Sequence, residues 1–234
     1  MEDMISSNFP IPWSMTRAEK ATLIQLLQNI RPEVAIEIGT YNGGSLQVLS
    51  EFSEKVYAID ITPEYRDEQC NRLKNVEYLL GDSKVMIPQL INKINDSNEN
   101  IEFVLIDGDH STKGVLEDIT NILKIIPKKP IIIILHDSFN PACRKGMKAY
   151  NYSNNDYVHK VELDYVNGAF NHDGLNREMW GGFGLIQLKP DKRIESIVVS
   201  EYQGKLFKVT YFRSIHFLRK LFWFLKPIYK VFKK

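Results

Sequence analysis

Acidic, serine and histidine side chains recur in this sequence directly after short apolar runs. Asp60 follows VYAI, Asp82-Ser83 comes just after VEYLL, and the segments 107–110 (DGDH) and 136–138 (HDS) follow FVLI and IIIIL. Carboxylate and imidazole groups bind cations, accept hydroxyl hydrogens and move protons. Helix capping explains any one of these motifs, since Asp and Ser are favoured before helices. The repeated pattern indicates a shared site instead.

A glycine-rich stretch, residues 34–45 (VAIEIGTYNGGS), comes first in this series. Its apolar start predicts a short buried strand, Gly39, Gly43 and Gly44 predict a turn, and a helical pattern begins at Leu46. Such a turn lets a ligand approach the backbone and the free N–H groups of a helix start. The spacing fails the G-x-G-x-x-G pattern of dinucleotide-binding proteins. Taken alone, the turn is also compatible with an ordinary tight connection.

Strand and helix patterns alternate between these motifs. A capping box at 16–19 (TRAE) predicts a helix that ends before Pro32. The segment before it, with Trp13 and Met15, is expected to cover the core, and folding over a bound ligand is the alternative. Alternation of this kind predicts a parallel sheet with right-handed crossovers, whose carboxyl strand ends meet at one edge. The expected strands are 34–38, 56–59, 76–80, 101–106 and 130–135, and the expected helices are 46–52, 64–73, 88–94 and 113–125.

Length and composition are those of an ordinary globular protein, with one domain and room for a large core. The chain has 234 residues and a net charge of +1, so nothing in its overall balance indicates a nucleic-acid partner. Two cysteines, Cys70 and Cys143, match no disulfide framework and no metal-binding spacing. The start of the sequence resembles no secretion signal, and no uncharged run is long enough to span a membrane. We therefore expect a cytoplasmic location.

The five motifs together resemble those of a known enzyme class. IEIGTYNGGS, YAID, GDS, FVLIDGDHS and LHDS, in this order, are similar to motifs of small class I S-adenosylmethionine-dependent methyltransferases. The similarity is to sugar- and antibiotic-tailoring O-methyltransferases and cephalosporin-hydroxylase-like proteins of the methyltransferase family 24 type. With the lead-in IPWSMTRAEKATL it covers roughly residues 10–190. It implies a methyltransferase domain over residues 1–190.

The resemblance implies a fold and a cofactor site. The fold is α/β, Rossmann-like and doubly wound, with a mostly parallel seven-stranded sheet and an antiparallel last strand; segments 158–163 and 183–188 are the expected last pair. S-adenosylmethionine is expected to bind with its methionine part at the glycine-rich turn, its ribose at Asp60 and its adenine at Asp82 and Ser83. The full expected set is Glu37, Gly39, Thr40, Tyr41, Gly43, Ser45, Asp60, Asp82, Ser83 and Asp107.

Catalysis requires alignment of the two substrates and removal of a proton from the acceptor hydroxyl. His110 is our preferred general base; the alternative is a helix-start residue bonded to a carboxylate. Metal-dependent relatives place carboxylates after the fourth and fifth strands to bind Mg²⁺, and Asp107 and Asp137 occupy these positions here. The expected catalytic residues are His110, Asp107 and His136, and the expected metal ligands are Asp107, His136 and Asp137.

His136 departs from this pattern, because Mg²⁺ rarely binds imidazole whereas Mn²⁺, Fe²⁺ or Zn²⁺ does. Three interpretations of His136 stay open: a metal ligand, a metal-independent base or orienting group, and a structural histidine bonded to the backbone. The expected divalent metal cofactor is Mg²⁺ or Mn²⁺. The acceptor is expected to be a small molecule or glycan, recognised in the loop before the last strand. Its candidate residues are Asn167, His172, Asp173, Asn176 and Arg177.

The end of the sequence differs from the rest in charge. Residues 203–234 contain nine Lys or Arg and no Asp or Glu, so residues 1–202 have 21 basic against 29 acidic residues, a net charge of −8. Residues 191–213 are expected to form an added β-hairpin. Residues 214–234 alternate apolar and basic clusters and predict an amphipathic helix, kinked at Pro227, on an anionic membrane surface. Packing on the domain or in a homodimer is the alternative.

These observations favour an O-methyltransferase that acts on a hydroxyl of a sugar, glycan or other small tailored molecule, with possible metal assistance. Two other functions stay open. A tailoring protein of the same fold with another activity is one, because a fold does not determine a reaction. A non-catalytic, cofactor-binding accessory protein at a membrane is the other.

Overall fold

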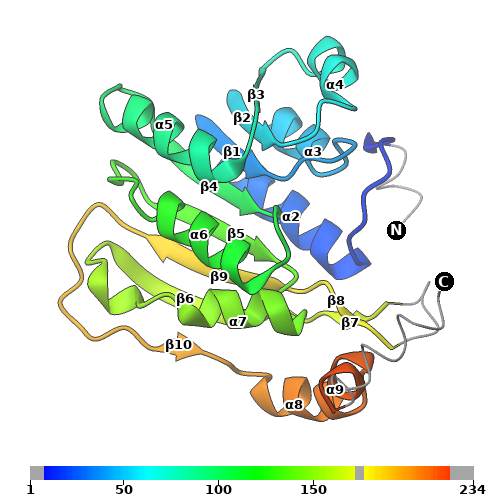
Figure 1. Ribbon diagram of the computed structural model, residues 1–234. Helices are drawn as coiled ribbons and strands as arrows, with labels where there is room; N and C mark the ends of the chain where they lie inside the picture. The colour runs from blue at the N-terminus through cyan, green and yellow to red at the C-terminus, as the bar shows by residue number, and fades with distance from the viewer. Residues whose placement is uncertain (1–7, 172–176, 222–234) are drawn as a thin grey trace.

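A central β-sheet with helices on both faces organises the computed structural model, which describes residues 8–171 and 177–221 (Figure 1). The strand order is β10-β6-β9-β5-β4-β1-β2-β3. Strand β9 is antiparallel to its neighbours β5 and β6, and the other pairs are parallel. The strands are β1 (Val34–Ile38), β2 (Lys55–Asp60), β3 (Val76–Leu80), β4 (Ile101–Ile106), β5 (Ile131–His136), β6 (Val158–Val166), β9 (Phe183–Leu188) and β10 (Val199–Ser200).

The predicted doubly wound α/β fold is confirmed, with one addition. The described sheet has eight strands, where the resemblance implied seven. The extra strand, β10, is two residues long and pairs in parallel with β6 at the sheet edge. A small second ribbon, β7 (Ala169–Phe170) with β8 (Met179–Trp180), extends from the connection between β6 and β9.

Two hydrophobic clusters form the core, one on each sheet face. Helices α5, α6 and α7 bury apolar side chains on one face, and α2 and α3 do so on the other. Strand β5 is apolar on both sides because both layers cover it. The helices are α2 (Arg17–Ile30), α3 (Leu46–Phe52), α4 (Arg66–Arg72), α5 (Ser83–Asn95), α6 (Thr112–Ile122), α7 (Pro141–Ala149), the short 3₁₀ turn η1 (Tyr152–Asn154), α8 (Gly204–Phe212) and α9 (Ile215–Leu221).

The sheet order reverses at β1, which lies between β2 and β4. Ligands of open parallel sheets bind at such a switch point, outside the carboxyl ends of the strands. Backbone hydrogen bonds continue past the strand ends here, because Gly39 N–H donates to Ile59 O at 2.9 Å and Asp107 N–H donates to Ile38 O at 2.8 Å. The motif after β1 is therefore tied to both neighbouring strands.

The predicted hairpin at residues 191–213 is wrong. Strand β10 is followed by helix α8, although the sequence of α8, GKLFKVTYF, is rich in strand-favouring residues. Phe207 explains the difference, because its ring packs edge-on against Phe139 with centroids 5.6 Å apart. In a helix, Phe207 and Tyr211 lie on the same side, facing the rest of the domain. This packing overrides the local preference of the sequence for a strand.

The predicted C-terminal helix is described only as far as Leu221, where α9 ends, and residues 222–234 lie outside the described part of the chain. Residues 172–176 of the expected acceptor loop also lie outside it. None of the described helices combines the length and the apolar character needed to cross a bilayer.

Candidate active site

A cavity of about 590 Å³ lies at the carboxyl ends of β1, β2 and β4, which is the size of a typical small-molecule site. The lead-in segment, the glycine-rich turn and the motifs after β2, β3 and β4 form its wall. Its carboxylates, Asp60, Asp82, Asp107 and Asp109, outnumber its one lysine, Lys84, so the cavity favours a cationic ligand. The lining includes Trp13, Met15, Gly39, Thr40, Tyr41, Ser45, Asp60, Asp82, Ser83, Asp107, Asp109 and His110.

Close backbone approach shapes the floor of this cavity. Gly39 has a φ of +81°, and a Cβ atom there would lie 2.2 Å from the carbonyl oxygen of Asp107. At Gly44 a Cβ atom would lie 2.1 Å from Cβ of Trp13, so the lead-in segment rests directly on the turn. Any side chain at either position would separate these elements. The glycines serve packing around the cavity as well as access to it.

Asp60 closes the turn after β1. Its Oδ2 accepts hydrogen bonds from the backbone N–H groups of Thr40 and Tyr41, both at 2.9 Å, and its Oδ1 accepts from Thr62 N–H at 2.8 Å. Burial alone would raise the pKa of Asp60, but these donors hold it below its usual value. The Asp60 carboxylate lies on the cavity wall. Ribose hydroxyls would donate to the same carboxylate oxygens that already accept from these backbone N–H groups.

Two of the expected cofactor residues lie behind the wall. Glu37 is fully buried and accepts a hydrogen bond from Ser45 Oγ. Burial raises the pKa of Glu37 to about 8. Gly43 faces Gln69, whose side chain donates to Tyr41 O at 2.7 Å. Both residues thus support the turn from outside the cavity.

The motif after β3 lines the other end of the cavity. Asp82 caps α5, because its side chain accepts from Lys84 N–H at 2.9 Å. Ser83 Oγ donates to Asp118 Oδ1 of α6 at 2.7 Å. Burial raises the pKa of Asp118 to about 6. The structure therefore gives both expected adenine residues a capping or bridging role in addition to their place on the wall.

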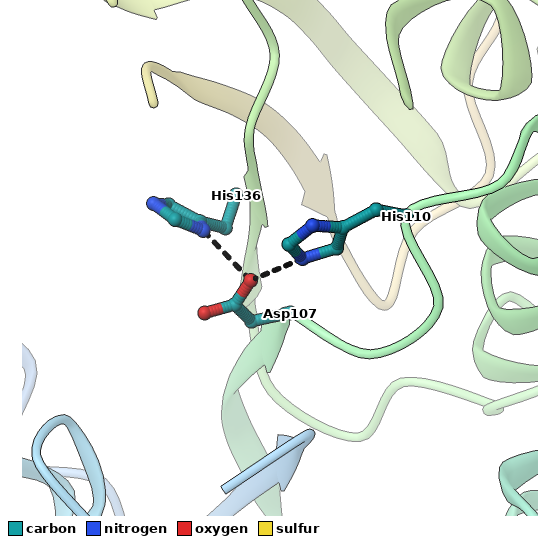
Figure 2. A group of neighbouring side chains, drawn as sticks. All are labelled: Asp107, His110 and His136. Atoms are coloured by element: carbon teal, nitrogen blue, oxygen red, sulfur yellow. Dashed lines mark hydrogen bonds and ion pairs between the residues drawn. The ribbon is translucent and has the colours of Figure 1, made fainter. Parts of the chain in front are cut away.

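Asp107, His110 and His136 form a compact cluster at the ends of β4 and β5 (Figure 2). Asp107 Oδ1 lies 3.2 Å from Nε2 of His110 and 2.7 Å from Nδ1 of His136. His110 is half exposed on the cavity wall, whereas His136 is buried behind it. The structure thus brings together all three expected catalytic residues.

Asp137 lies next to this cluster in a left-handed backbone conformation, with a φ of +58°. Its Oδ1 accepts from Gly181 N–H at 2.6 Å, and its Oδ2 lies 3.2 Å from Nδ1 of His110. Burial raises the pKa of Asp137. His110 therefore lies between two carboxylates.

Glu19 is a site residue that sequence reasoning missed. The predicted capping box is present, with Thr16 N–H donating to Glu19 Oε2 at 2.6 Å. The other oxygen, Oε1, accepts from Gly182 N–H at 2.7 Å and lies 3.1 Å from Nε2 of His136, an ion-pair contact. The capping motif accounts for Glu19 locally, so no signal in the sequence indicated its second role.

His136 is consequently clamped between two acids from opposite ends of the chain. Burial would lower its pKa, but the Asp107 and Glu19 carboxylates outweigh burial and raise the pKa of His136 well above its usual value. The pKa values of Glu19 and Asp107 are lowered, because contact with His136 overcomes the effect of their burial. These contacts favour the protonated form of His136 and hold Asp107 in place.

The expected acceptor residues are only partly described. Arg177 adopts a left-handed conformation, and its carbonyl oxygen accepts from Ile215 N–H at 3.4 Å. Neither Asn167 nor Arg177 lines the cavity. His172, Asp173 and Asn176 lie outside the described residues.

Comparison with known proteins agrees with this geometry. Residues 36–138 match the model of a methyltransferase domain family. No curated protein sequence matches the chain.

Solved structures share the fold. An O-methyltransferase from Bacillus cereus in complex with S-adenosylhomocysteine has 16% identity and a TM-score of 0.57, over 80% of this chain and 89% of that one. An O-methyltransferase from Streptomyces achromogenes involved in tomaymycin synthesis, in complex with S-adenosylmethionine, has 14% identity and a TM-score of 0.56, over 80% and 87%. Residues 36–138 are therefore similar to a methyltransferase domain family, and the chain shares its fold with these O-methyltransferases.

Proposed function

We propose that this enzyme transfers a methyl group from S-adenosylmethionine to a hydroxyl oxygen of a small molecule, sugar or glycan. The observation that carries the proposal is the position of His110, a half-exposed imidazole at the edge of the cofactor cavity and between Asp107 and Asp137. Oxygen acceptors need such a group, because an alcohol must lose its proton as the new bond forms.

The cavity residues fit this cofactor. Asp60, Asp82, Asp107 and Asp109 supply negative charge along a wall that also has apolar parts at Trp13 and Met15. S-adenosylmethionine supplies an electrophilic methyl group on a positively charged sulfur and carries an ammonium group. The acidic wall attracts both charges, and the apolar segment excludes water from the reacting end.

His110 is the proposed general base. Asp107 contacts one of its ring nitrogens and Asp137 contacts the other. Contact with Asp107 raises the pKa of His110, so the imidazole has to be in its neutral form to act as a base. Its unprotonated nitrogen then leaves one carboxylate and accepts the proton of the acceptor hydroxyl. The buried Glu19–His136–Asp107 chain keeps Asp107 in place during this exchange.

The same cluster is a poor fit for Mg²⁺. Asp107, His110 and His136 offer ligand atoms within 4.8 Å of one another, but two of the three are imidazoles, whereas Mg²⁺ prefers oxygen ligands. A metal-bound histidine must also be unprotonated, and the pKa of His136 is raised well above its usual value by its two acidic neighbours. We therefore propose proton transfer through His110 without Mg²⁺, with Mn²⁺ assistance as the second candidate.

The experiment is methyl transfer from labelled S-adenosylmethionine to a panel of hydroxylated small molecules, sugars and glycans. Reactions with added chelator, Mg²⁺ or Mn²⁺ test the metal in the same assay. Label on an acceptor oxygen, with a rate unchanged by chelator, supports the proposal. A rate restored only by Mn²⁺ supports the second candidate.

The remaining alternatives predict other outcomes of this assay. A non-catalytic accessory protein binds S-adenosylmethionine but labels no acceptor. A tailoring protein with another activity alters an acceptor without gain of label. Either result contradicts the proposed O-methyl transfer.

A further inference from the structure

Helix α8 turns apolar side chains toward solvent. Leu206, Val209 and Phe212 are 45%, 51% and 61% exposed, and helical spacing places them on one face with the exposed Lys205 and Lys208. A surface helix of a globular domain normally directs such an apolar stripe toward the core. This stripe has no covering element among the described residues.

The opposite face of α8 fixes this orientation. Phe207 packs against Phe139, and the guanidinium of Arg144 lies 4.5 Å from its ring centroid. Arg144 is itself buried and donates to Asp164 Oδ1 at 2.7 Å and to Glu201 Oε1 at 3.0 Å. Rotation of α8 to bury its outer stripe would break this set of contacts.

A basic hollow of about 680 Å³ lies beside the stripe, between α7, α8 and α9. Lys145, Lys205, Lys208 and Lys220 line it, and no described residue forms an ion pair or hydrogen bond with any of these four side chains. The acid in the lining, Glu201, is already bound by Arg144 and Lys148. The hollow therefore carries uncompensated positive charge.

Helix α9 also combines exposed apolar side chains with basic residues. It lies beside α8 (Figure 1), and the Phe217 ring packs edge-on against Phe212 with centroids 5.1 Å apart. Leu218 and Leu221 on α9 are 46% and 51% exposed. The chain continues beyond α9 with FWFLKPIYKVFKK, a sequence that again combines aromatic and basic residues without an acid.

We propose that the outer face of α8 and α9, together with this basic hollow, is a docking surface for an anionic lipid bilayer. Charge complementarity selects this occupant: apolar side chains beside unpaired lysines match a surface with a hydrocarbon layer under anionic headgroups. A folded protein partner would need an acidic rim placed around an apolar groove in one fixed geometry. The inference does not depend on the proposed reaction.

The docking surface is linked to the catalytic cluster through a short stretch of chain. Ile215 at the start of α9 is bonded to Arg177, which precedes β8. Strand β8 then leads into Gly181 and Gly182, whose amides bind Asp137 and Glu19.

The test is sedimentation of the full chain with vesicles of phosphatidylcholine plus phosphatidylserine, compared with vesicles of phosphatidylcholine alone. The protein is expected to bind only the anionic vesicles, and less tightly at high salt. K205E/K208E is expected to weaken binding at least about tenfold. F212S is expected to weaken it too, through loss of inserted apolar area. K74E/K124E and I126S, which change exposed residues elsewhere, are expected to bind as the unaltered chain does.

Three outcomes overturn the proposal. The first is equal binding to both kinds of vesicle or to neither, and the second is binding by K205E/K208E that equals that of K74E/K124E. The third is a dimer, seen by light scattering, that F212S abolishes in a protein that binds no vesicles; this result assigns the face to a second copy of the chain. Calorimetry with S-adenosylmethionine on each variant keeps failure at this surface distinct from failure of the cofactor site.

Discussion

Asp107 is the residue that holds the cluster of Asp107, His110 and His136 together. It accepts from both histidines, which differ in environment: His110 is half exposed on the cavity wall and His136 is buried behind it. The exposed histidine is suited to proton exchange with a substrate, and the buried one to holding the carboxylate in place. One acid thus links the cavity to the interior.

Replacement of His110 tests its role as the base. His110→Ala is expected to lower kcat by about 10² to 10⁴-fold, the usual contribution of a general base, because the substrate hydroxyl then loses its proposed base. Steady-state methyl transfer measures this effect, and calorimetry measures cofactor affinity, which should change little. His159→Ala, remote on β6, is the control. A kcat within about threefold of the unaltered enzyme would rule out His110 as the base.

Glu19 is expected to matter for stability through His136. Glu19→Gln keeps the size of the side chain and its ability to accept from Gly182, but it removes the negative charge that faces the buried His136 ring. Breaking one partner of a buried ion pair typically costs about 3 kcal/mol. Denaturant unfolding should show a loss of this size, against about 0.5 kcal/mol or less for the exposed Glu54→Gln. Equal stabilities would show that the pair contributes nothing.

At the scale of elements, the turn after β1 is the most constrained segment of the site. Gly39 approaches the backbone that follows β4, and Gly44 approaches the lead-in segment. The strands on either side fix the turn through backbone hydrogen bonds. Its shape is therefore set by the sheet as much as by its own sequence.

A methyl group at Gly39 should therefore disrupt the site. In Gly39→Ala the added Cβ would meet the Asp107 carbonyl, and the φ of +81° would be strained as well. We expect a loss of unfolding free energy of about 2 kcal/mol or more together with loss of cofactor binding. Gly204→Ala is the matched control, because its Cβ would meet no atom closer than 3.5 Å. Similar behaviour of the two variants in thermal unfolding would contradict the packing argument.

The contact between α5 and α6 predicts a pH dependence of stability. Asp118 is buried, and its pKa rises from 3.8 to about 6 in the folded protein. A raised pKa stabilises the fold at low pH, and this contribution is lost as the pH rises through about 6. Asp118→Asn keeps an acceptor for Ser83 without a charge, so it should be more stable than the unaltered protein above this pH by up to about 3 kcal/mol. Urea unfolding at pH 4 and pH 8 measures the effect, and the same difference at both would contradict it.

Local patterns in the sequence were sufficient to predict most strands and helices of the methyltransferase domain. The alternation of strands and helices and the motifs at strand ends predicted strands β1 to β5 along the chain, because apolar runs and capping residues act over a few positions. Contacts between distant segments were not predictable in this way. The sequence indicates only a capping role for Glu19. It predicts Gly43 and Glu37 as cofactor contacts, although both residues lie behind the cavity wall. Helix α8 was missed because Phe207 is anchored by Phe139, far away in the sequence.

At the scale of the whole molecule, charge is divided between two regions. Residues 1–202 carry a net charge of −8 and include the acidic cavity, whereas residues 203–234 carry nine basic residues and no acid. The acidic region suits a cationic cofactor, and the basic region suits an anionic surface. This separation is invisible in the overall net charge of +1.

The central claim is that the cavity at the carboxyl ends of β1, β2 and β4 binds S-adenosylmethionine. Calorimetric titration of the full chain tests it most directly, with Asp60→Ala as the site variant and Asp191→Ala, on a distant surface loop, as the control. We predict one binding site, with affinity retained in the control and reduced at least about tenfold in Asp60→Ala. Absence of binding to the unaltered chain, or equal affinity in both variants, would contradict the claim.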